Sequence, residues 1–238
     1  MARGAAAVAR DARPERVVAV LGMHRSGTSA FVGSLQQRGL FLGAHNRQNR
    51  HNPRGNRENR RVLGLNEAVL GDSGGSWREP PAAIEWSAER LDEGRAILAE
   101  YSGRPLWGFK DPRTLLTFEG WERLIPDIEL VGIFRHPASV ARSLASRPNL
   151  PVTDPLRLWT TYNERLLALH SRRPFPVVSF DDEAAVLERN FARVAEALGL
   201  EAAGESFFTA DLRSGDVQPG ALPAPVAALY EELRAIAL

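Results

Sequence analysis

The stretch GMHRSGTS, residues 22–29, decides the fold that the sequence predicts. It follows RVVAVLG (16–22), a short apolar run typical of a buried parallel strand. It leads into TSAFVGSLQQRG (28–39), which has apolar residues at helical spacing and ends at a glycine, a favoured residue just beyond a helix. A strand, a glycine-containing loop and a helix in this order form a unit whose backbone N–H groups can bind phosphate.

The loop lacks one residue of the phosphate-binding motif of nucleoside triphosphatases. That motif has two glycines five apart, then Lys, then Ser or Thr, and here Thr28 stands in place of the lysine. Without it, a β/γ-phosphate pair loses its main cationic partner, but a single terminal phosphate can still bind. Besides the backbone N–H groups, the loop offers hydrogen-bond donors from its side chains. These are the guanidinium of Arg25 and the hydroxyls of Ser26, Thr28 and Ser29.

Strands and helices are predicted to alternate along the rest of the chain. Further strands are expected at residues 39–43, 105–109, 128–134 and 174–180, and helices at 91–101, 117–124, 139–146, 156–170, 183–198 and 226–238. This alternation predicts an α/β fold, a P-loop NTPase-like three-layer sandwich with a central parallel sheet. We expect a disordered leader at 1–15, one α/β domain at 16–204, and a C-terminal connector and short helix at 205–238 that pack on the same domain.

The composition excludes several classes of protein. The 238 residues carry a net charge of +1, which predicts no nucleic-acid partner, and no cysteine, which excludes disulfides and a thiol nucleophile. No run approaches the roughly 18 apolar residues of a membrane span, so we expect a cytoplasmic protein. The oligomeric state is left open.

A second cation stands where a triphosphatase needs an acid. The apolar run IELVGIF (128–134) is followed by Arg135, whereas a magnesium-dependent enzyme usually has an aspartate at such a strand end. A cation there repels a metal ion and attracts a second phosphate. The sequence therefore predicts two anion sites and no metal site, which suits a nucleotide that carries phosphates at separate places.

Three blocks, GMHRSGTS, GFKDPRT and FRHPASVARSLASR, resemble in their order and spacing the sulfotransferases that use 3′-phosphoadenosine-5′-phosphosulfate (PAPS). The resemblance covers about residues 17–200 and is greatest to the bacterial branch whose first motif reads HRSGTS. It implies that PAPS is the co-substrate and that the 5′-phosphosulfate loop consists of Arg25, Ser26, Gly27, Thr28 and Ser29. It implies that the 3′-phosphate is bound by Arg135, Ser143 and Arg147.

The predicted catalytic residues are two cations and two acids. Arg25 and Lys110, the only lysine in the chain, are expected to stabilise the charge that develops as the sulfuryl group leaves. Glu58 is the first candidate for the general base and Asp111 the second, although an aspartate beside Lys110 can equally serve to orient its neighbours. His51 is a further candidate, because its imidazole titrates near neutral pH.

The acceptor is predicted to be a small polar molecule with a hydroxyl group. Asn56 and Arg57 stand where relatives often have aromatic residues, which favours a sugar, a nucleoside or another polar natural product. Trp159 and Tyr162 are expected to be core residues, and the alternative is a position near the adenine or the acceptor. Two other functions stay open: a P-loop kinase for a small molecule, and a catalytically inactive protein that still binds PAPS.

Overall fold

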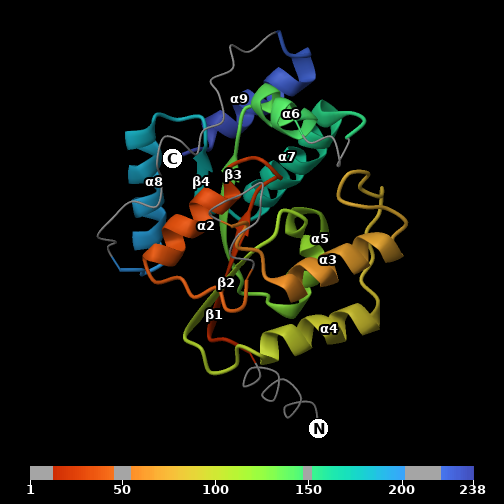
Figure 1. The fold of residues 1–238 in the computed structure, drawn as a ribbon, viewed down its shortest axis with the longest axis vertical. Coiled ribbons are helices and arrows are strands. Elements are labelled where there is room, and N and C mark those ends of the chain that lie inside the picture. The colour runs from red at the N-terminus through yellow and green to blue at the C-terminus, as the bar shows by residue number, and fades with distance from the viewer. Residues whose placement is uncertain (1–12, 46–54, 147–151, 202–220) are drawn as a thin grey trace. The chain divides into compact units, whose positions relative to one another are not determined.

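The computed structural model describes residues 13–45, 55–146, 152–201 and 221–238. Its strands form one parallel sheet in the order β2-β1-β3-β4, flanked by helices (Figure 1). The described strands are β1 (Arg16–Leu21), β2 (Leu106–Lys110), β3 (Glu129–Phe134) and β4 (Val177–Ser179). The prediction of an α/β fold around a central parallel sheet is therefore confirmed.

The chain divides into two compact units. The first consists of Met1–Ala19 and Leu40–Glu129, and the second of Val20–Gly39 and Leu130–Leu238. The loop at 22–29 and the turn after β3 therefore belong to the second unit, whereas Glu58, Lys110 and Asp111 belong to the first.

The first unit contains α3 (Arg60–Asp72), α4 (Ala88–Ala99) and α5 (Thr114–Leu124), which pack against one another. Its core holds a column of aromatic rings, with centroid distances between neighbours of 4.4 to 5.7 Å: Tyr101, Trp107, Phe109, Trp121 and Trp86. Offset and edge-to-face contacts at these distances add to the stabilisation from apolar burial.

The second unit contains α2 (Thr28–Gln37), α6 (Pro137–Ala145), α7 (Pro155–Arg172), α8 (Ala184–Ala197) and α9 (Ala224–Ala235). Figure 1 shows α2 beside α8 on one side of β3 and β4, with α7 on the other side and α6 and α9 next to α7. In the register of the parallel pair, Gly132 is opposite Val177 and Phe134 is opposite Ser179. After α9, the backbone N–H of Leu238 donates to the carbonyl of Val177 at 3.0 Å, which anchors this end to β4.

Two predictions about elements were wrong. The segment 39–43 is not a strand, although its alternating Leu40 and Leu42 are buried. Gly43 turns the chain away with φ of 64°, and a Cβ at this glycine would overlap the ring of Tyr101. The second error is an omission: no helix is predicted from the sequence at residues 60–72, where the structure has α3, a helix of 13 residues.

Two other predictions lie mostly outside the described residues. The leader at 1–15 is described only from residue 13, and the connector after 204 only from residue 221. Both stay predictions.

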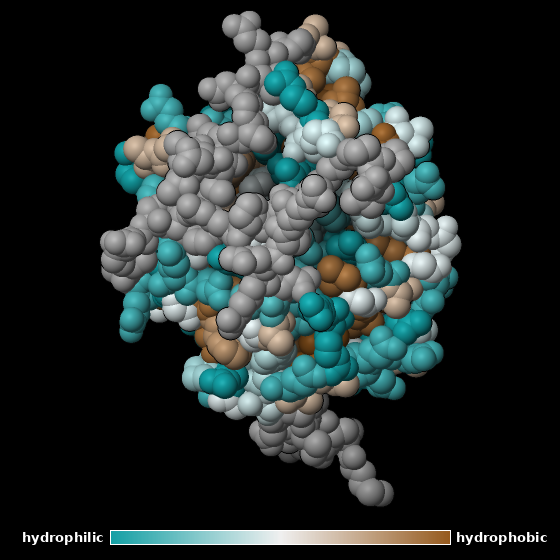
Figure 2. All heavy atoms as spheres, in the orientation of Figure 1, coloured by the Kyte–Doolittle hydropathy of each residue, from teal (hydrophilic) through white to brown (hydrophobic). Residues whose placement is uncertain are grey.

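The described surface is largely hydrophilic on the face in Figure 2. Among the described residues, the large hydrophobic side chains that are exposed are Phe41 and Leu238. None of the helices in the described ranges has both the length and the apolar character needed to cross a membrane.

Candidate functional site

The two glycines of the 22–29 loop are required by close contacts within the second unit. A Cβ at Gly22 would lie 2.5 Å from the carbonyl oxygen of Ile133 in β3. A Cβ at Gly27 would overlap the ring of Phe180, and the φ of Gly27 is +86°. Because no larger residue fits at either position, the glycines hold the loop tightly against β3 and the segment after β4.

Arg25 joins this loop to the helix that follows β3. Its Nε donates to Oγ of Ser143 in α6 at 2.7 Å. The φ of Arg25 is 70°, a left-handed conformation that costs free energy for any residue with a Cβ. The residue expected at the 5′-phosphosulfate and a residue expected at the 3′-phosphate are therefore in direct contact.

The loop retains features of an anion site. The hydroxyl of Ser26 is fully buried and has no hydrogen-bond partner in the described part of the chain. Helix α2 begins at Thr28 without a side-chain cap on its first N–H groups. A buried hydroxyl and a helix N-terminus, both lacking a side-chain acceptor, fit an anionic oxygen placed between them.

Arg135 follows β3 and is 7% exposed. Its guanidinium carbon lies 5.3 Å from the ring centroid of Phe180, the ring that also contacts Gly27. The indole Nε1 of Trp159 in α7 donates to the carbonyl of Arg135 at 2.9 Å. Phe180 and Trp159 thus support the arginine side chain and its backbone, respectively. Both Trp159 and Tyr162 are fully buried, as expected for core residues.

His136 caps the helix that carries Ser143. Its Nδ1 accepts from the backbone N–H of Ala138 at 3.2 Å, which requires Nδ1 to be unprotonated. Burial lowers the pKa of His136, and the nearby carboxylate of Asp181 opposes this effect. Burial raises the pKa of Asp181, although the hydrogen bond from the backbone of His136 and the charge of Arg135 act in the opposite direction.

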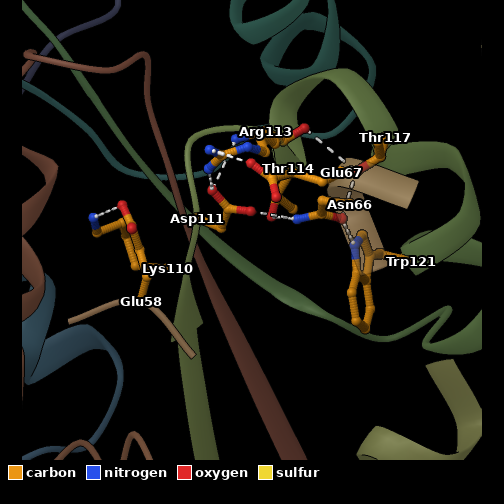
Figure 3. Close-up of polar contacts among 9 residues, drawn as sticks. All are labelled: Glu58, Asn66, Glu67, Lys110, Asp111, Arg113, Thr114, Thr117 and Trp121. Atoms are coloured by element: carbon orange, nitrogen blue, oxygen red, sulfur yellow. Dashed lines mark hydrogen bonds and ion pairs between the residues drawn. The ribbon is translucent and has the colours of Figure 1, made fainter. Parts of the chain in front are cut away.

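Glu58 and Lys110 form a buried ion pair in the first unit (Figure 3). Lys110 Nζ donates to Glu58 Oε1 at 2.9 Å, and the two side chains are 1% and 10% exposed. Each charge compensates the desolvation of the other, because an unpaired charge at such a site is very costly. Glu58 lies between Arg57, whose φ is 55°, and Asn59, whose side chain caps α3.

Asp111 lies in a separate hydrogen-bond network of the first unit, to the right of the ion pair in Figure 3. Its Oδ2 accepts from Asn66 at 2.9 Å, and its Oδ1 accepts from the guanidinium of Arg113 at 2.8 Å. Asn66 in turn accepts from Thr117 and Trp121, both at 2.8 Å. The carboxylate of Asp111 is completely buried and connects the end of β2 to α3 and α5.

The structure brings several of the predicted residues together in pairs. Arg25 meets Ser143 in the second unit, and Glu58 meets Lys110 in the first. Arg147 and His51 lie outside the described residues. In the ranges that the structure describes, no three His, Asp or Glu side chains cluster so that they could hold a metal ion.

Four residues at these sites were not predicted to be there: Asn66, Phe180, Asp181 and Tyr230. Phe180 and Asp181 carry a usable signal, because they directly follow the apolar run that forms β4, and strand ends meet at one edge of a parallel sheet. The sequence gives no such signal for Asn66 and Tyr230, since the residues that they contact are far away along the chain.

Solved structures of two sulfotransferases are similar to this chain. The sulfotransferase domain of the olefin synthase from Synechococcus PCC 7002 is 19% identical over 95% of this chain and 90% of its own, with a TM-score of 0.52. Sulfotransferase STF1 from Mycobacterium tuberculosis H37Rv is 17% identical over 96% of this chain and 79% of its own, with a TM-score of 0.41. No family model and no curated protein matches the chain. The likeness to the first structure shows that the chain has the fold of a sulfotransferase domain.

Proposed function

We propose that this protein is a PAPS-dependent sulfotransferase that transfers the sulfuryl group to a hydroxyl of a small polar acceptor. The observation that carries the proposal is the contact between Arg25 and Ser143, at 2.7 Å. It joins the glycine loop to helix α6, which follows the turn after β3, and the loop and the end of β3 are the two places where the sequence predicts anion sites. A nucleotide with a 5′-phosphosulfate and a 3′-phosphate presents two anions of this kind, whereas a triphosphate presents one continuous chain.

The donor is held by the second unit in this proposal. The 5′-phosphosulfate binds to Ser26, Thr28, Ser29 and the N–H groups at the start of α2, and the 3′-phosphate binds to Arg135, Ser143 and Arg147. The buried hydroxyl of Ser26 supports the first assignment, and the supported guanidinium of Arg135 supports the second. Arg25, which donates to Ser143, also forms charged hydrogen bonds to the donor in this proposal.

The transfer step is an in-line displacement at sulfur that does not require a metal ion. Glu58 takes the proton of the acceptor hydroxyl, whose oxygen forms a bond to sulfur as the bond from sulfur to the 5′-phosphate oxygen breaks. The leaving group is 3′-phosphoadenosine 5′-phosphate (PAP). Arg25 and Lys110 stabilise the charge that grows on the departing and sulfuryl oxygens, and such fixed cations lower the barrier more than they stabilise the bound substrate.

Asp111 has a supporting role in this proposal. Its carboxylate is completely buried and both of its oxygens already accept, Oδ2 from Asn66 and Oδ1 from Arg113, so a proton on either oxygen would compete with the bond made there. Glu58 is less enclosed and has one described hydrogen-bond partner, Lys110. We therefore assign the general base to Glu58 and assign Asp111 to holding the end of β2.

The identity of the donor nucleotide can be tested by comparing the affinities for PAP, ADP and ATP. Titration calorimetry should show that PAP binds at least tenfold more tightly than ADP or ATP, because only PAP fills the site of Arg135 and Ser143. Magnesium should not improve PAP binding. If ATP with magnesium binds more tightly than PAP, the protein is a kinase and the proposal fails.

Glu58→Gln tests the base. With labelled PAPS and a panel of sugars, nucleosides and natural-product alcohols, the variant should lose about 10²–10⁴-fold in kcat and bind PAP as the wild type does. Glu67→Gln is the matched control, because Glu67 pairs with Arg113 in the same unit and is half exposed. Wild-type protein that binds PAP but transfers to no acceptor in the panel would favour the inactive relative, and full activity of Glu58→Gln would remove Glu58 as the base.

A further inference from the structure

A half-buried acid outside the proposed machinery, Asp181, lies two residues beyond β4. Oδ2 of Asp181 accepts from the backbone N–H of His136 at 2.6 Å and from the hydroxyl of Tyr230 in α9 at 3.3 Å. The segment after β4, the turn after β3 and the C-terminal helix therefore meet at one carboxylate oxygen. His136 directly follows Arg135, the residue proposed to bind the 3′-phosphate.

The peptide group between Arg135 and His136 is held at both of its polar atoms. Its carbonyl accepts from the indole of Trp159 at 2.9 Å, and its N–H donates to Asp181. These two bonds fix the plane of the peptide group, and with it the backbone dihedral angles on either side. The direction in which Arg135 leaves the strand and the direction in which α6 begins both depend on that plane.

Helix α9 covers the same turn. The ring of Tyr230 contacts the imidazole of His136 edge-on, with centroids 4.8 Å apart, and the ring of Phe134 at 5.9 Å. His136 caps α6, which carries Ser143, so Tyr230 packs on the residue that starts this helix.

We propose that Asp181 and Tyr230 are positioning residues for the 3′-phosphate site, so that the C-terminal helix takes part in selecting the donor. They clamp the peptide group after Arg135 and thereby aim its guanidinium and Ser143 at the phosphate. This inference rests on the proposed function, since it assumes that these two residues bind that group.

If Asp181 acts on PAP binding through its charge, its substitution should change the affinity in the opposite direction from that expected if it acts by positioning Arg135. A carboxylate near a phosphate site repels the ligand, so removal of its charge alone should tighten binding. Removal of the clamp should weaken binding, because Arg135 and Ser143 lose their alignment. Asp181→Ala removes both charge and acceptor, whereas Asp181→Asn removes the charge and keeps an acceptor for the N–H of His136.

The experiment compares the affinities for PAP and for adenosine 5′-monophosphate (AMP) by titration calorimetry. Asp181→Ala should bind PAP about tenfold more weakly and AMP nearly as well as the wild type does, which lowers the preference for the 3′-phosphate. Asp181→Asn should restore PAP binding to at least the wild-type level. Tyr230→Phe, which removes only the hydroxyl, should lose about threefold for PAP.

Arg234→Ala is the matched control, because Arg234 lies one turn further along α9 and pairs with Asp182. It should leave the preference unchanged. If the wild type binds AMP as tightly as PAP, the proposed function and this inference both fail. If the wild type prefers PAP, and Asp181→Ala keeps that preference or strengthens it, the inference alone fails. If Asp181→Ala does not fold, an unchanged preference in Tyr230→Phe overturns it.

Discussion

Arg25 is the residue at which local conformational cost and proposed chemistry coincide. A non-glycine residue at φ of 70° is stable only when its surroundings compensate, and the bond from Nε to Ser143 is one such compensation. Glycine occupies this region with little strain, whereas alanine does not. Comparison of the two substitutions therefore separates the backbone cost from the loss of the guanidinium.

We predict that Arg25→Gly is more stable than Arg25→Ala by about 1 kcal/mol. Both variants should bind PAP at least tenfold more weakly than the wild type, since both lose the charged donor. Urea unfolding measures the first quantity and titration calorimetry the second. Equal stabilities would show that the left-handed conformation is not retained at this position.

Gly27 allows a second test with a matched control. Gly27 and Gly39 both have positive φ, of +86° and +103°, but only at Gly27 would a Cβ meet another group, the ring of Phe180. Substitution by alanine should cost about 1 kcal/mol at each position for the conformation, and Gly27→Ala should lose about 1–3 kcal/mol more for the overlap. Urea unfolding of both variants gives the difference, and a difference near zero would contradict the packing described around the loop.

The sequence reveals the requirement for these glycines but not its cause. The motif spacing predicts that Gly22 and Gly27 matter for a phosphate-binding loop. The contacts of Gly22 with β3 and of Gly27 with Phe180 arise from segments more than 100 residues away along the chain. The contact of Arg25 with Ser143 could not be predicted for the same reason.

At the scale of helices and strands, four of the five apolar runs that were predicted to be strands coincide with one, and the run at 39–43 does not. The runs at 16–22, 105–109, 128–134 and 174–180 each coincide with a strand, because strands of a parallel sheet covered by helices are apolar on both faces. Helix α3 was missed because it follows an arginine-rich stretch and contains Gly64 and Gly71, both unfavourable in a helix. Its buried residues recur at helical spacing, and Asn59 caps it, so the sequence did carry a signal for it.

Helix α6 should lose its cap in acid. The folded state holds His136 neutral, since Nδ1 accepts from Ala138, and burial lowers its pKa from the ordinary value of 6.5. The unfolded chain therefore binds a proton at a higher pH than the folded chain does. The stability that neutral His136 contributes is complete above pH 6.5 and is lost as the pH falls through the lower folded pKa.

His136→Asn separates the cap from the titration. Asparagine is a good N-cap without a proton to gain, so the variant should gain stability relative to the wild type as the pH falls from 7 to 5. Taking this difference removes the contributions of groups that do not interact with His136. Asp181, whose carboxylate faces His136, is coupled to its charge and therefore contributes to the difference. His136→Ala should lose about 1 kcal/mol at neutral pH for want of a cap. Urea unfolding curves at several pH values measure these free energies of unfolding. If the free energy of unfolding depends on pH in the same way for the wild type and for His136→Asn, the titration of His136 does not affect stability.

At the scale of the whole molecule, the residues proposed for donor binding and for proton removal belong to different units. The donor is bound by residues of the second unit, whereas the base and Lys110 come from the first. Buried polar side chains occur in both, and their loss should have different consequences. In the first unit, Asn66 uses both of its donors and both acceptor positions, on Asp111, Thr114, Thr117 and Trp121.

Asn66→Ala should therefore lower the free energy of unfolding by about 3 kcal/mol, because buried donors and an acid lose their partner, and leave the affinity for PAP unchanged. Trp159→Phe is the counterpart in the second unit: it removes the bond to the carbonyl of Arg135 and should weaken PAP binding about three- to tenfold. PAP at about 1,000 times its Kd should add about 4 kcal/mol to the stability of Asn66→Ala, as it does for the wild type, because independent perturbations add. Urea unfolding with and without PAP measures both quantities. A loss of PAP affinity in a folded Asn66→Ala protein would mean that donor binding depends on the first unit as well, and the division of roles would have to be abandoned.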